Sequence, residues 1–341
     1  MSSNSPVVEG TESWRPRDGD PFVSVEGLIF YTFGYHHPYG RVLAFLKYVP
    51  ERISELFPLD WLDRVWVFRG ERMLRPKTLF SPNHYRIVLE AFRRHMPHHV
   101  YRHPNLRRDV VAPPLSHVRE AYTPAGALRR LLAKGHRDDL EEVAVRLVET
   151  LSESSGVPLE DFGIHGSICL EMHDELSDVD LAVYGGRNYL RVLETLRRLE
   201  GEGVLKLSRS TQDEVRRGNV GRFMGKRFVV NAVRKHEEIG EEPQATPVGP
   251  AKIVCRVLDN SEAMFRPAVY RVETLEVLEG GEQARKVSEV VSMVGAYRMY
   301  ARPGEVVEVR GFLERAELHG RMWMRLVVGS AMEEEYMRCL G

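Results

Sequence analysis

A small-residue turn, followed after a fixed gap by two spaced aspartates, places the strongest constraint on how this chain folds. The turn is Gly163-Ile164-His165-Gly166-Ser167, and the segment Ser177-Asp178-Val179-Asp180-Leu181-Ala182-Val183 follows nine residues later. Asp178 and Asp180 are two residues apart, so on a β-strand both carboxylates leave the same face. The apolar residues between and after them then point to the opposite face. The pattern predicts a strand, a tight turn and a second strand with one buried face.

Both halves of this motif offer groups that bind phosphate or metal. Two carboxylates held side by side repel each other unless a cation lies between them, and hard oxygen ligands favour Mg²⁺ or Mn²⁺. Gly166 lets the backbone approach a ligand closely, and the hydroxyl and amide of Ser167 can hydrogen-bond a phosphate. The motif therefore predicts a phosphate-binding turn beside a metal site, which is what chemistry on a nucleoside triphosphate requires.

The arrangement resembles the signature of the DNA polymerase β-like nucleotidyltransferase superfamily. Gly166-Ser167, the ten residues 168–177 and Asp178-Val179-Asp180-Leu181 fit its pattern of apolar-Gly-Ser, a gap and Asp-apolar-Asp-apolar. The wider segment 123–185 is similar to archaeal predicted nucleotidyltransferases. The superfamily resemblance covers residues 139–235, under a third of the chain. It implies an enzyme that moves a nucleoside monophosphate from a nucleoside triphosphate to an acceptor hydroxyl and releases pyrophosphate.

The resemblance also assigns roles to individual residues. Asp178 and Asp180 would hold Mg²⁺ or Mn²⁺ and act as catalytic residues, with Asn231 at the third catalytic position. Gly166 and Ser167 would contact the β and γ phosphates. The remaining phosphate charge would be neutralised by three cationic residues, Arg222, Lys226 and Arg227.

Two positions depart from the superfamily pattern. A third carboxylate is usual on a later strand, but the best-placed strand presents Asn231, which can ligate a metal through its carbonyl and cannot accept a proton. Glu237 and Glu238 are nearby alternatives in a linker-like segment. Glu171 stands where many relatives have glycine, and a carboxylate there repels a triphosphate unless it points away.

These departures keep two other functions open. The first is a nucleotidyltransferase-fold protein without catalysis that serves as an RNA- or protein-binding scaffold. The second is a transferase that acts on a protein or small molecule, with flanking domains that are purely structural.

The charge of the chain is unevenly distributed, although its net value is only −1. Residues 21–115 carry 14 Arg and Lys against 8 Asp and Glu, a balance of +6. Basic side chains among aromatic ones in residues 85–108 can grip a phosphate backbone and stack unpaired bases. The solvated basic face of an amphipathic helix explains the same pattern equally well. RNA is therefore a candidate partner, through Arg93, Arg94, Arg102, Arg107 and Arg108.

Cysteine usage and hydropathy bear on the cellular compartment. Cys169, Cys255 and Cys339 are odd in number and widely spaced, which suits a reducing cytosol better than a disulfide frame or a zinc site. No apolar run approaches the length of a membrane span, and the first twenty residues do not resemble a secretory signal. We therefore expect a cytoplasmic protein with no membrane partner. The sequence leaves the oligomeric state open.

The expected fold class is α+β, with a central nucleotidyltransferase-like mixed sheet between two flanking domains. The expected segments are a disordered tail (1–20), a basic α+β domain (21–115), a nucleotidyltransferase domain (116–240), a linker (241–250) and a β-rich, barrel-like module (251–341). Capping signals and apolar periodicity predict helices over 81–94, from 116, from 123, over 137–155 and over 187–199. Alternating residues predict a hairpin of 27–33 with 41–48 and a strand at 227–233.

Overall fold

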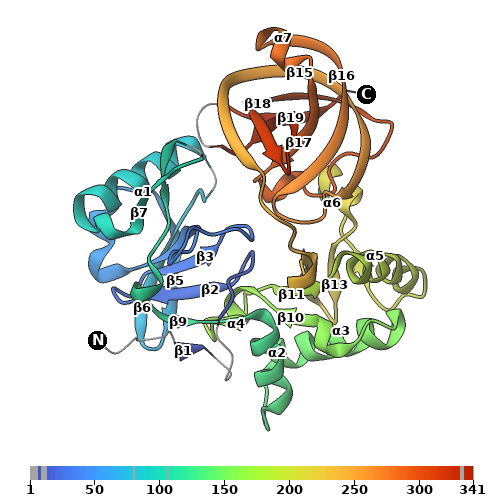
Figure 1. Cartoon of the computed structure of the whole chain (residues 1–341). Coiled ribbons are helices and arrows are strands. Elements are labelled where there is room, and N and C mark those ends of the chain that lie inside the picture. Colours follow the sequence, from blue (N-terminus) through green and yellow to red (C-terminus); the bar gives the residue numbers. More distant parts are fainter. Residues whose placement is uncertain (1–6, 9–13, 80, 106, 331–333, 341) are drawn as a thin grey trace.

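The structure has a mixed α+β architecture, as the sequence predicts, and its described residues form three larger sheets (Figure 1). It is a computed structural model that describes residues 7–8, 14–79, 81–105, 107–330 and 334–340. Figure 1 shows the N-terminal sheet in blue, the helices of the middle segment in green and a C-terminal group of curved strands in orange and red. Within the described residues, no helix is long and apolar enough to cross a membrane.

The first sheet contains seven strands in the order β1-β9-β2-β3-β4-β6-β5. These strands are β1 (Val7–Val8), β2 (Pro21–Ser24), β3 (Ile29–Thr32), β4 (Ala44–Pro50), β5 (Trp61–Phe68), β6 (Glu71–Pro76) and β9 (Val118–Ala121). The predicted hairpin is confirmed, because β3 and β4 pair antiparallel. Helix α1 (Pro82–His95) packs on this sheet in a common apolar core, and a hairpin of β7 (Val100–His103) and β8 (Arg108–Val111) follows it. The side chain of Ser81 caps α1 by accepting the amide of His84 at 3.1 Å, as predicted.

Two predictions at the edges of this sheet are wrong. A helix does not start at Ser116: residues 115–117 form a single 3₁₀ turn, η3 (Leu115–His117), that leads directly into β9. The ladder of β9 with β2 satisfies the backbone there, so pairing with a neighbour outweighs the local capping signal. The tail prediction fails for residues 7–8, which form β1 and pair with β9. It also fails for residues 14–20, where Asp18 and Asp20 are buried and Trp14 Nε1 donates to Asp20 Oδ2 at 3.1 Å. Residues 1–6 and 9–13 lie outside the described residues.

The middle sheet has the order β10-β11-β14-β13-β12, with β11 and β14 parallel and the other neighbours antiparallel. Its strands are β10 (Phe162–Ile164), β11 (Val179–Tyr184), β12 (Lys206–Leu207), β13 (Val220–Phe223) and β14 (Lys226–Val233). The accompanying helices are α2 (Pro124–Ala133), α3 (Asp139–Ser155), α4 (Gly166–Cys169), α5 (Gly186–Gly201) and α6 (Gln212–Arg217). The predicted helices α2, α3 and α5 and the strand β14 are therefore confirmed. Asp138 starts α3 with a capping box to Glu141.

The C-terminal strands form a closed ring. They are β15 (Gln244–Glu262), β16 (Ala268–Glu279), β17 (Val287–Ser292), β18 (Val306–Leu318), β19 (Arg321–Val328) and β20 (Tyr336–Cys339), with the short helix α7 (Gly281–Ala284). Because β15 pairs with both β16 and β18, the sheet closes on itself as a barrel. Residues 244–250 belong to β15, so the expected linker 241–250 is wrong over most of its length. Pro247 is accommodated at a shift in the β15–β18 register.

The apolar cores join parts of the chain that are distant in sequence. One face of the first sheet packs with α1, whereas residues such as Tyr31, Tyr48 and Trp66 belong to the core of the middle sheet. Met264 and Phe265, which follow β15, enter that same core. The N-terminal sheet, the middle sheet and the base of the barrel therefore meet at one junction. Short 3₁₀ segments complete the connections: η1 (Glu51–Leu56), η2 (Pro97–His99), η4 (Leu159–Asp161), η5 (His236–Glu238) and η6 (Gly295–Tyr297).

Candidate nucleotide site

The Gly-Ser turn and the second aspartate are in direct contact. Gly166 opens α4 with φ +70°, and a Cβ built on it would lie 2.3 Å from Asp180 Oδ2. Only glycine fits this position, because both the left-handed backbone and the approaching carboxylate exclude a side chain. The amide of His165 also donates to the backbone carbonyl of Asp180 at 2.7 Å. The turn and the aspartate strand are thus held together as one unit.

Strand β14 presents Arg227 and Asn231 to the same face as the aspartates. In the β11–β14 ladder Asp180 lies opposite Val229, and Ala182 lies opposite Asn231. Residues that pair in this way share a face, so Arg227, Val229 and Asn231 all flank the aspartate pair. No carboxylate comes from this face of β14. The third acid that the resemblance leads one to expect is therefore missing from this strand.

The two polar residues of that face are already bonded. Arg227 donates to Asp178 Oδ2 at 2.6 Å and to Glu214 Oε1 at 3.2 Å. Asn231 Oδ1 accepts from the guanidinium of Arg298 at 2.8 Å, and Arg298 directly follows η6 of the barrel segment. Asn231 is thus an acceptor that helps to hold a cation at the site.

The alternative third acids do not reach the aspartates. Glu238 accepts from the amides of Gly186 and Lys235, which directs it to the start of α5. Glu237 is exposed beside it. Glu171 forms an ion pair with Arg130 at 3.0 Å and is not among the described residues that line the cavity beside Asp180, so it does not face a triphosphate bound there.

Asp180 opens onto a cavity of about 380 Å³ at the junction of the three sheets. The cavity is lined by Asp18, Gly19, Tyr31, Phe45, Lys47, Arg75, Leu79, His165, Gly166, Asp180, Val229, Asn231, Ala232, Val233, Arg266 and Arg298. These residues come from the N-terminal sheet and the loop before it, from the middle sheet and from the barrel. Four of the side chains are cationic and two are carboxylic, so the cavity favours an anion.

Two of the cationic side chains, Lys47 and Arg75, have no ion pair with a carboxylate among the described residues. Lys47 Nζ lies 3.8 Å from the centroid of the Tyr31 ring, and no described carboxylate is within ion-pair distance of it. Burial lowers the pKa of Lys47 to about 7, so a nearby anion would favour its charged form. Arg75 Nε is buried without a hydrogen-bond partner in the described part of the chain. An unpaired buried donor of this kind is costly, and an anionic ligand would satisfy it.

The other titratable groups of the cavity either pair with a side chain of the protein or have a pKa that burial shifts. Arg266 Nε pairs with Asp18 Oδ1 at 2.8 Å. Burial raises the pKa of Asp180, an effect that the positive charge of Lys47 partly offsets. Burial lowers the pKa of His165 to about 3, so this imidazole is neutral at physiological pH. Its ring packs against Gly19, which agrees with a packing role.

Only some of the residues predicted to contact phosphate lie near the aspartates or the cavity. Ser167 is outside the described lining of the cavity, and its carbonyl accepts the amides of Leu170 and Met172. Arg222 lies opposite Arg227, on the same face, but it is exposed and donates to the carbonyl of Gly225 at 3.0 Å. Lys226 belongs to the other face of β14 and donates to the carbonyl of Glu175 at 3.3 Å. Arg227 is the member of the predicted cationic set that touches an aspartate.

Sequence reasoning missed the cations that line the cavity. Lys47, Arg75, Arg266 and Arg298 lie outside the motif and come from elements far apart in the chain. A charged residue within the apolar strand Ala44–Pro50 was a usable signal for Lys47. The sequence holds no comparable signal for the three arginines.

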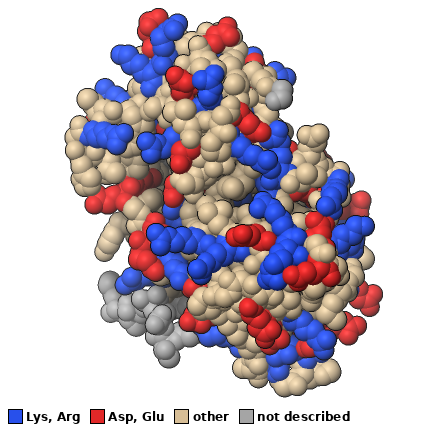
Figure 2. Space-filling model, turned by 90° about the vertical axis from the view of Figure 1, so that its right-hand side faces the viewer, with Lys and Arg blue, Asp and Glu red and all other residues tan. Residues whose placement is uncertain are grey.

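The basic segment 86–108 is largely neutralised by its own neighbours. Arg93 and Arg102 pair with Asp109, at 2.7 Å and 3.5 Å, and Arg94 pairs with Glu90 at 2.8 Å. Arg107 is exposed, and Arg108 donates to the carbonyl of Ser330 in the barrel segment. Figure 2 views the molecule from the side of α5 and the barrel, and there too Lys and Arg side chains form a band with Asp and Glu interspersed.

The aromatic residues of this segment do not form a stacking surface. Phe92 is completely buried in the core beneath α1. The hydroxyl of Tyr85 accepts the amide of Val111 at 3.1 Å, so this side chain is also engaged in the fold. The contacts therefore fit the solvated-helix interpretation better than a single-strand RNA groove.

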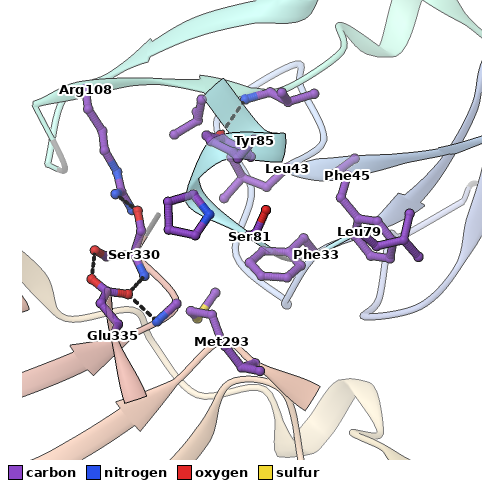
Figure 3. Close-up of a pocket in the computed structure, with 16 residues that line it drawn as sticks. Phe33, Leu43, Phe45, Leu79, Ser81, Tyr85, Arg108, Met293, Ser330 and Glu335 are labelled. Carbon is purple, nitrogen blue, oxygen red and sulfur yellow. Dashed lines mark hydrogen bonds between the residues drawn. The ribbon is translucent and has the colours of Figure 1, made fainter. Parts of the chain in front are cut away.

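A second cavity of about 210 Å³ lies next to the first, because Phe45 and Leu79 line both. Figure 3 shows aromatic and aliphatic side chains at one end of it and Arg108, Ser330 and Glu335 at the other. Glu335 accepts the amides of Gly329 and Ser330, so the polar groups at that end are already satisfied. Among the described residues that line it, Arg108 is the one Lys or Arg side chain, and it donates to the carbonyl of Ser330.

Comparison with known proteins adds a relative of unassigned activity. An uncharacterized protein of Methanocaldococcus jannaschii is 26% identical to the chain over 351 residues, which cover 95% of this chain and 99% of the relative. The likeness therefore extends over all three sheets. No protein-family model matches the chain, and no solved structure gives a significant match.

Proposed function

We propose that the cavity beside Asp180 binds a nucleoside triphosphate and that the chain transfers its nucleotidyl group to an acceptor hydroxyl. The observation that carries this proposal is the position of Asp180. It lies between the Gly166 turn and a cavity whose walls contain Lys47, Arg75 and Arg298. A carboxylate beside a cationic pocket can bind both a metal ion and the phosphates that the metal accompanies.

The residues present fit Mg²⁺ in part. Asp178 and Asp180 offer hard oxygen donors on one face of the sheet, and Mg²⁺ sites commonly use one or two carboxylates together with substrate phosphates. When bound, the metal would withdraw charge from the phosphate oxygens and help the leaving group to depart. Arg227 must release Asp178 for both carboxylates to take part.

In this proposal the cationic side chains of the cavity bind the triphosphate of the nucleotide. Lys47 and Arg75 have unused donor capacity, so they are placed to bind phosphate oxygens. In the reaction, a bond forms between the acceptor oxygen and the α-phosphorus, and the bond from that phosphorus to the pyrophosphate oxygen breaks. The hydroxyl proton leaves to water, because β14 offers no carboxylate to receive it.

The Arg227–Asp178 ion pair favours a second candidate function. An enzyme that needs both carboxylates gains nothing from neutralising one of them, whereas a binding protein can use the pair to hold its strands together. In that case the cavity binds a nucleotide without turning it over. The structure gives little support to RNA as a partner under either candidate function, because the arginines of segment 86–108 are mostly paired with other groups of the protein.

Nucleotide binding and pyrophosphate release, measured on the same protein, separate the candidates. Each nucleoside triphosphate is titrated by calorimetry with Mg²⁺, and pyrophosphate is then assayed with total RNA and with small hydroxyl compounds. Asp180→Asn and Lys47→Met should each weaken binding at least about tenfold. Glu175→Gln is the matched control, since it removes one exposed charge from the loop before β11.

The outcomes are distinct. Binding with pyrophosphate release supports the transferase, and binding without release supports the second candidate. If no triphosphate binds at millimolar concentration, or if Asp180→Asn and Lys47→Met bind as well as the control, the proposed site is wrong.

A further inference from the structure

Two histidines and a glutamate from separate segments lie close together at one end of the first sheet. This is the end where the turn between β2 and β3 lies. Glu26 lies in that turn, and His98 and His99 form the end of η2, just after α1. Glu26 Oε1 is 2.8 Å from His98 Nε2, and Glu26 Oε2 is 3.3 Å from His99 Nε2. One ligand atom from each of the three residues lies within 4.8 Å of the others.

The spacing of these atoms suits a small metal ion. Zinc binds histidine nitrogen and carboxylate oxygen at about 2.0 to 2.2 Å in tetrahedral geometry, which places ligand atoms roughly 3.3 Å apart. The two observed separations, 2.8 and 3.3 Å, lie at or slightly below this value, so an ion needs only small side-chain movements to enter. Imidazole and carboxylate together favour zinc and similar transition metals over Mg²⁺ or Ca²⁺.

The backbone around the three side chains is fixed before any metal binds. Arg41 donates to the carbonyl of His98 at 2.9 Å, and the amide of Ala112 donates to the carbonyl of His99 at 2.8 Å. The amide of Val25, next to Glu26, donates to the carbonyl of His117 at 3.0 Å. A preorganised ligand set of this kind loses little conformational entropy on binding.

Burial differs among the three residues in a way that leaves one side of the cluster open. The side chain of His99 is fully buried, and its Nδ1 has no hydrogen-bond partner in the described part of the chain. The side chains of His98 and Glu26 are 33% and 20% exposed, so water can reach a fourth position on an ion. The ring of His117 stacks on His98 with centroids 4.3 Å apart. Nearly parallel rings do not aim their nitrogens at one ion, so His117 supports His98 and is not itself a ligand.

We propose that Glu26, His98 and His99 bind one divalent transition metal ion of the zinc type, with water as the fourth ligand. The ion joins the β2–β3 turn to the segment that follows α1. The site lies outside the nucleotide cavity and does not depend on the function proposed for it. A simple hydrogen-bonded cluster, in which Glu26 accepts from the two imidazoles, is the alternative that the experiment must exclude.

Metal binding is tested on the full chain after removal of metal by a chelator. Zn²⁺ is added and measured by calorimetry, and Co²⁺ is added separately because tetrahedral Co²⁺ absorbs visible light. We expect one ion per chain, intense visible absorption with Co²⁺ and a higher melting temperature with Zn²⁺. Glu26→Gln and His98→Asn should weaken Zn²⁺ at least about tenfold and abolish the Co²⁺ band.

Two control variants identify the site. His95→Asn removes an exposed histidine at the end of α1 and should leave binding unchanged. His173→Asn disrupts the second cluster that could hold an ion, Asp138, Glu141 and His173, and should also leave it unchanged. The proposal is overturned if Zn²⁺ fails to bind at micromolar concentration, if the Glu26 and His98 variants bind normally, or if His173→Asn abolishes the signal. Circular dichroism checks that each variant is folded.

Discussion

Arg227 and Asp178 form an ion pair of 2.6 Å that joins β14 to the start of β11 and neutralises the first aspartate of the motif. Both side chains are more than a third exposed, so the pair contributes little to stability. Its main consequence is chemical, because it competes with a metal ion for Asp178. The balance between these two partners decides whether both aspartates can hold a cation.

Removing the guanidinium should therefore strengthen metal binding. For Arg227→Met we expect the affinity for Mn²⁺ to rise about three- to tenfold, while the free energy of unfolding falls by no more than about 1 kcal/mol. Calorimetric titration with Mn²⁺ measures the first effect and urea denaturation the second. Arg222→Met is the control, because Arg222 is on the same face and has no carboxylate partner among the described residues. Equal Mn²⁺ affinity in the wild type and Arg227→Met would show that the pair does not compete with metal.

Gly166→Ala should disturb both the fold and the site. The left-handed backbone alone costs about 1–2 kcal/mol with alanine, and contact of the new Cβ with Asp180 should add about 1–3 kcal/mol. Nucleotide affinity should fall as well, because the Asp180 carboxylate must move. Gly225→Ala is a matched control, since Gly225 has φ +80° and open space around it. If the two variants lose equal stability in urea denaturation, the close approach of Asp180 has no energetic effect.

Asp20 should make stability depend on pH. Burial raises its pKa from 3.8 to about 7. Between these values the folded state binds more protons than the unfolded state, so the free energy of unfolding falls as the pH rises from about 4 to about 7. Asp20→Asn keeps an acceptor for Trp14 and removes the titration. We expect it to be about 1–4 kcal/mol more stable than the wild type at pH 8 and nearly equal at pH 4. Urea denaturation at both pH values checks this, with the exposed Asp60→Asn as the control.

Asp18→Asn should weaken the junction between the N-terminal loop and the barrel. The Asp18–Arg266 ion pair is nearly buried, with exposed side-chain fractions of 7% and 12%. Removing one charge of such a pair leaves the other uncompensated, which costs about 3–5 kcal/mol. Glu202→Gln breaks the half-exposed pair with Arg198 and should cost less than about 1 kcal/mol. Similar losses for the two variants in thermal or urea denaturation would show that the junction pair contributes no more than a surface pair.

Local patterns predicted the elements whose signals are complete within a few residues. The Ser81-Pro82 and Thr123-Pro124 caps mark helices that begin where expected, because capping is satisfied by nearby amides. The same type of signal failed at Ser116, where the ladder with β2 provides the backbone partners. The charges and prolines that predicted a linker also failed at residues 244–250, where pairing with β18 extends β15 through two prolines. Strand partners that lie far away in sequence cannot be inferred from a local window.

The sequence by itself determined that Asp178 and Asp180 share one face of a strand, because side chains two residues apart on a strand point the same way. It also indicated that Asn231 stands where the resemblance leads one to expect an acid. The register of β11 and β14 places Asn231 on the same face as the two aspartates. The close contact of Gly166 with Asp180 came from the tertiary structure. Tertiary structure alone decided what surrounds the aspartates. Lys47, Arg75, Arg266 and Arg298 reach the cavity only because three sheets pack at one junction, and Arg227 meets Asp178 only through strand pairing. Charges separated by so many residues become neighbours through burial of the shared core, which no short-range pattern records.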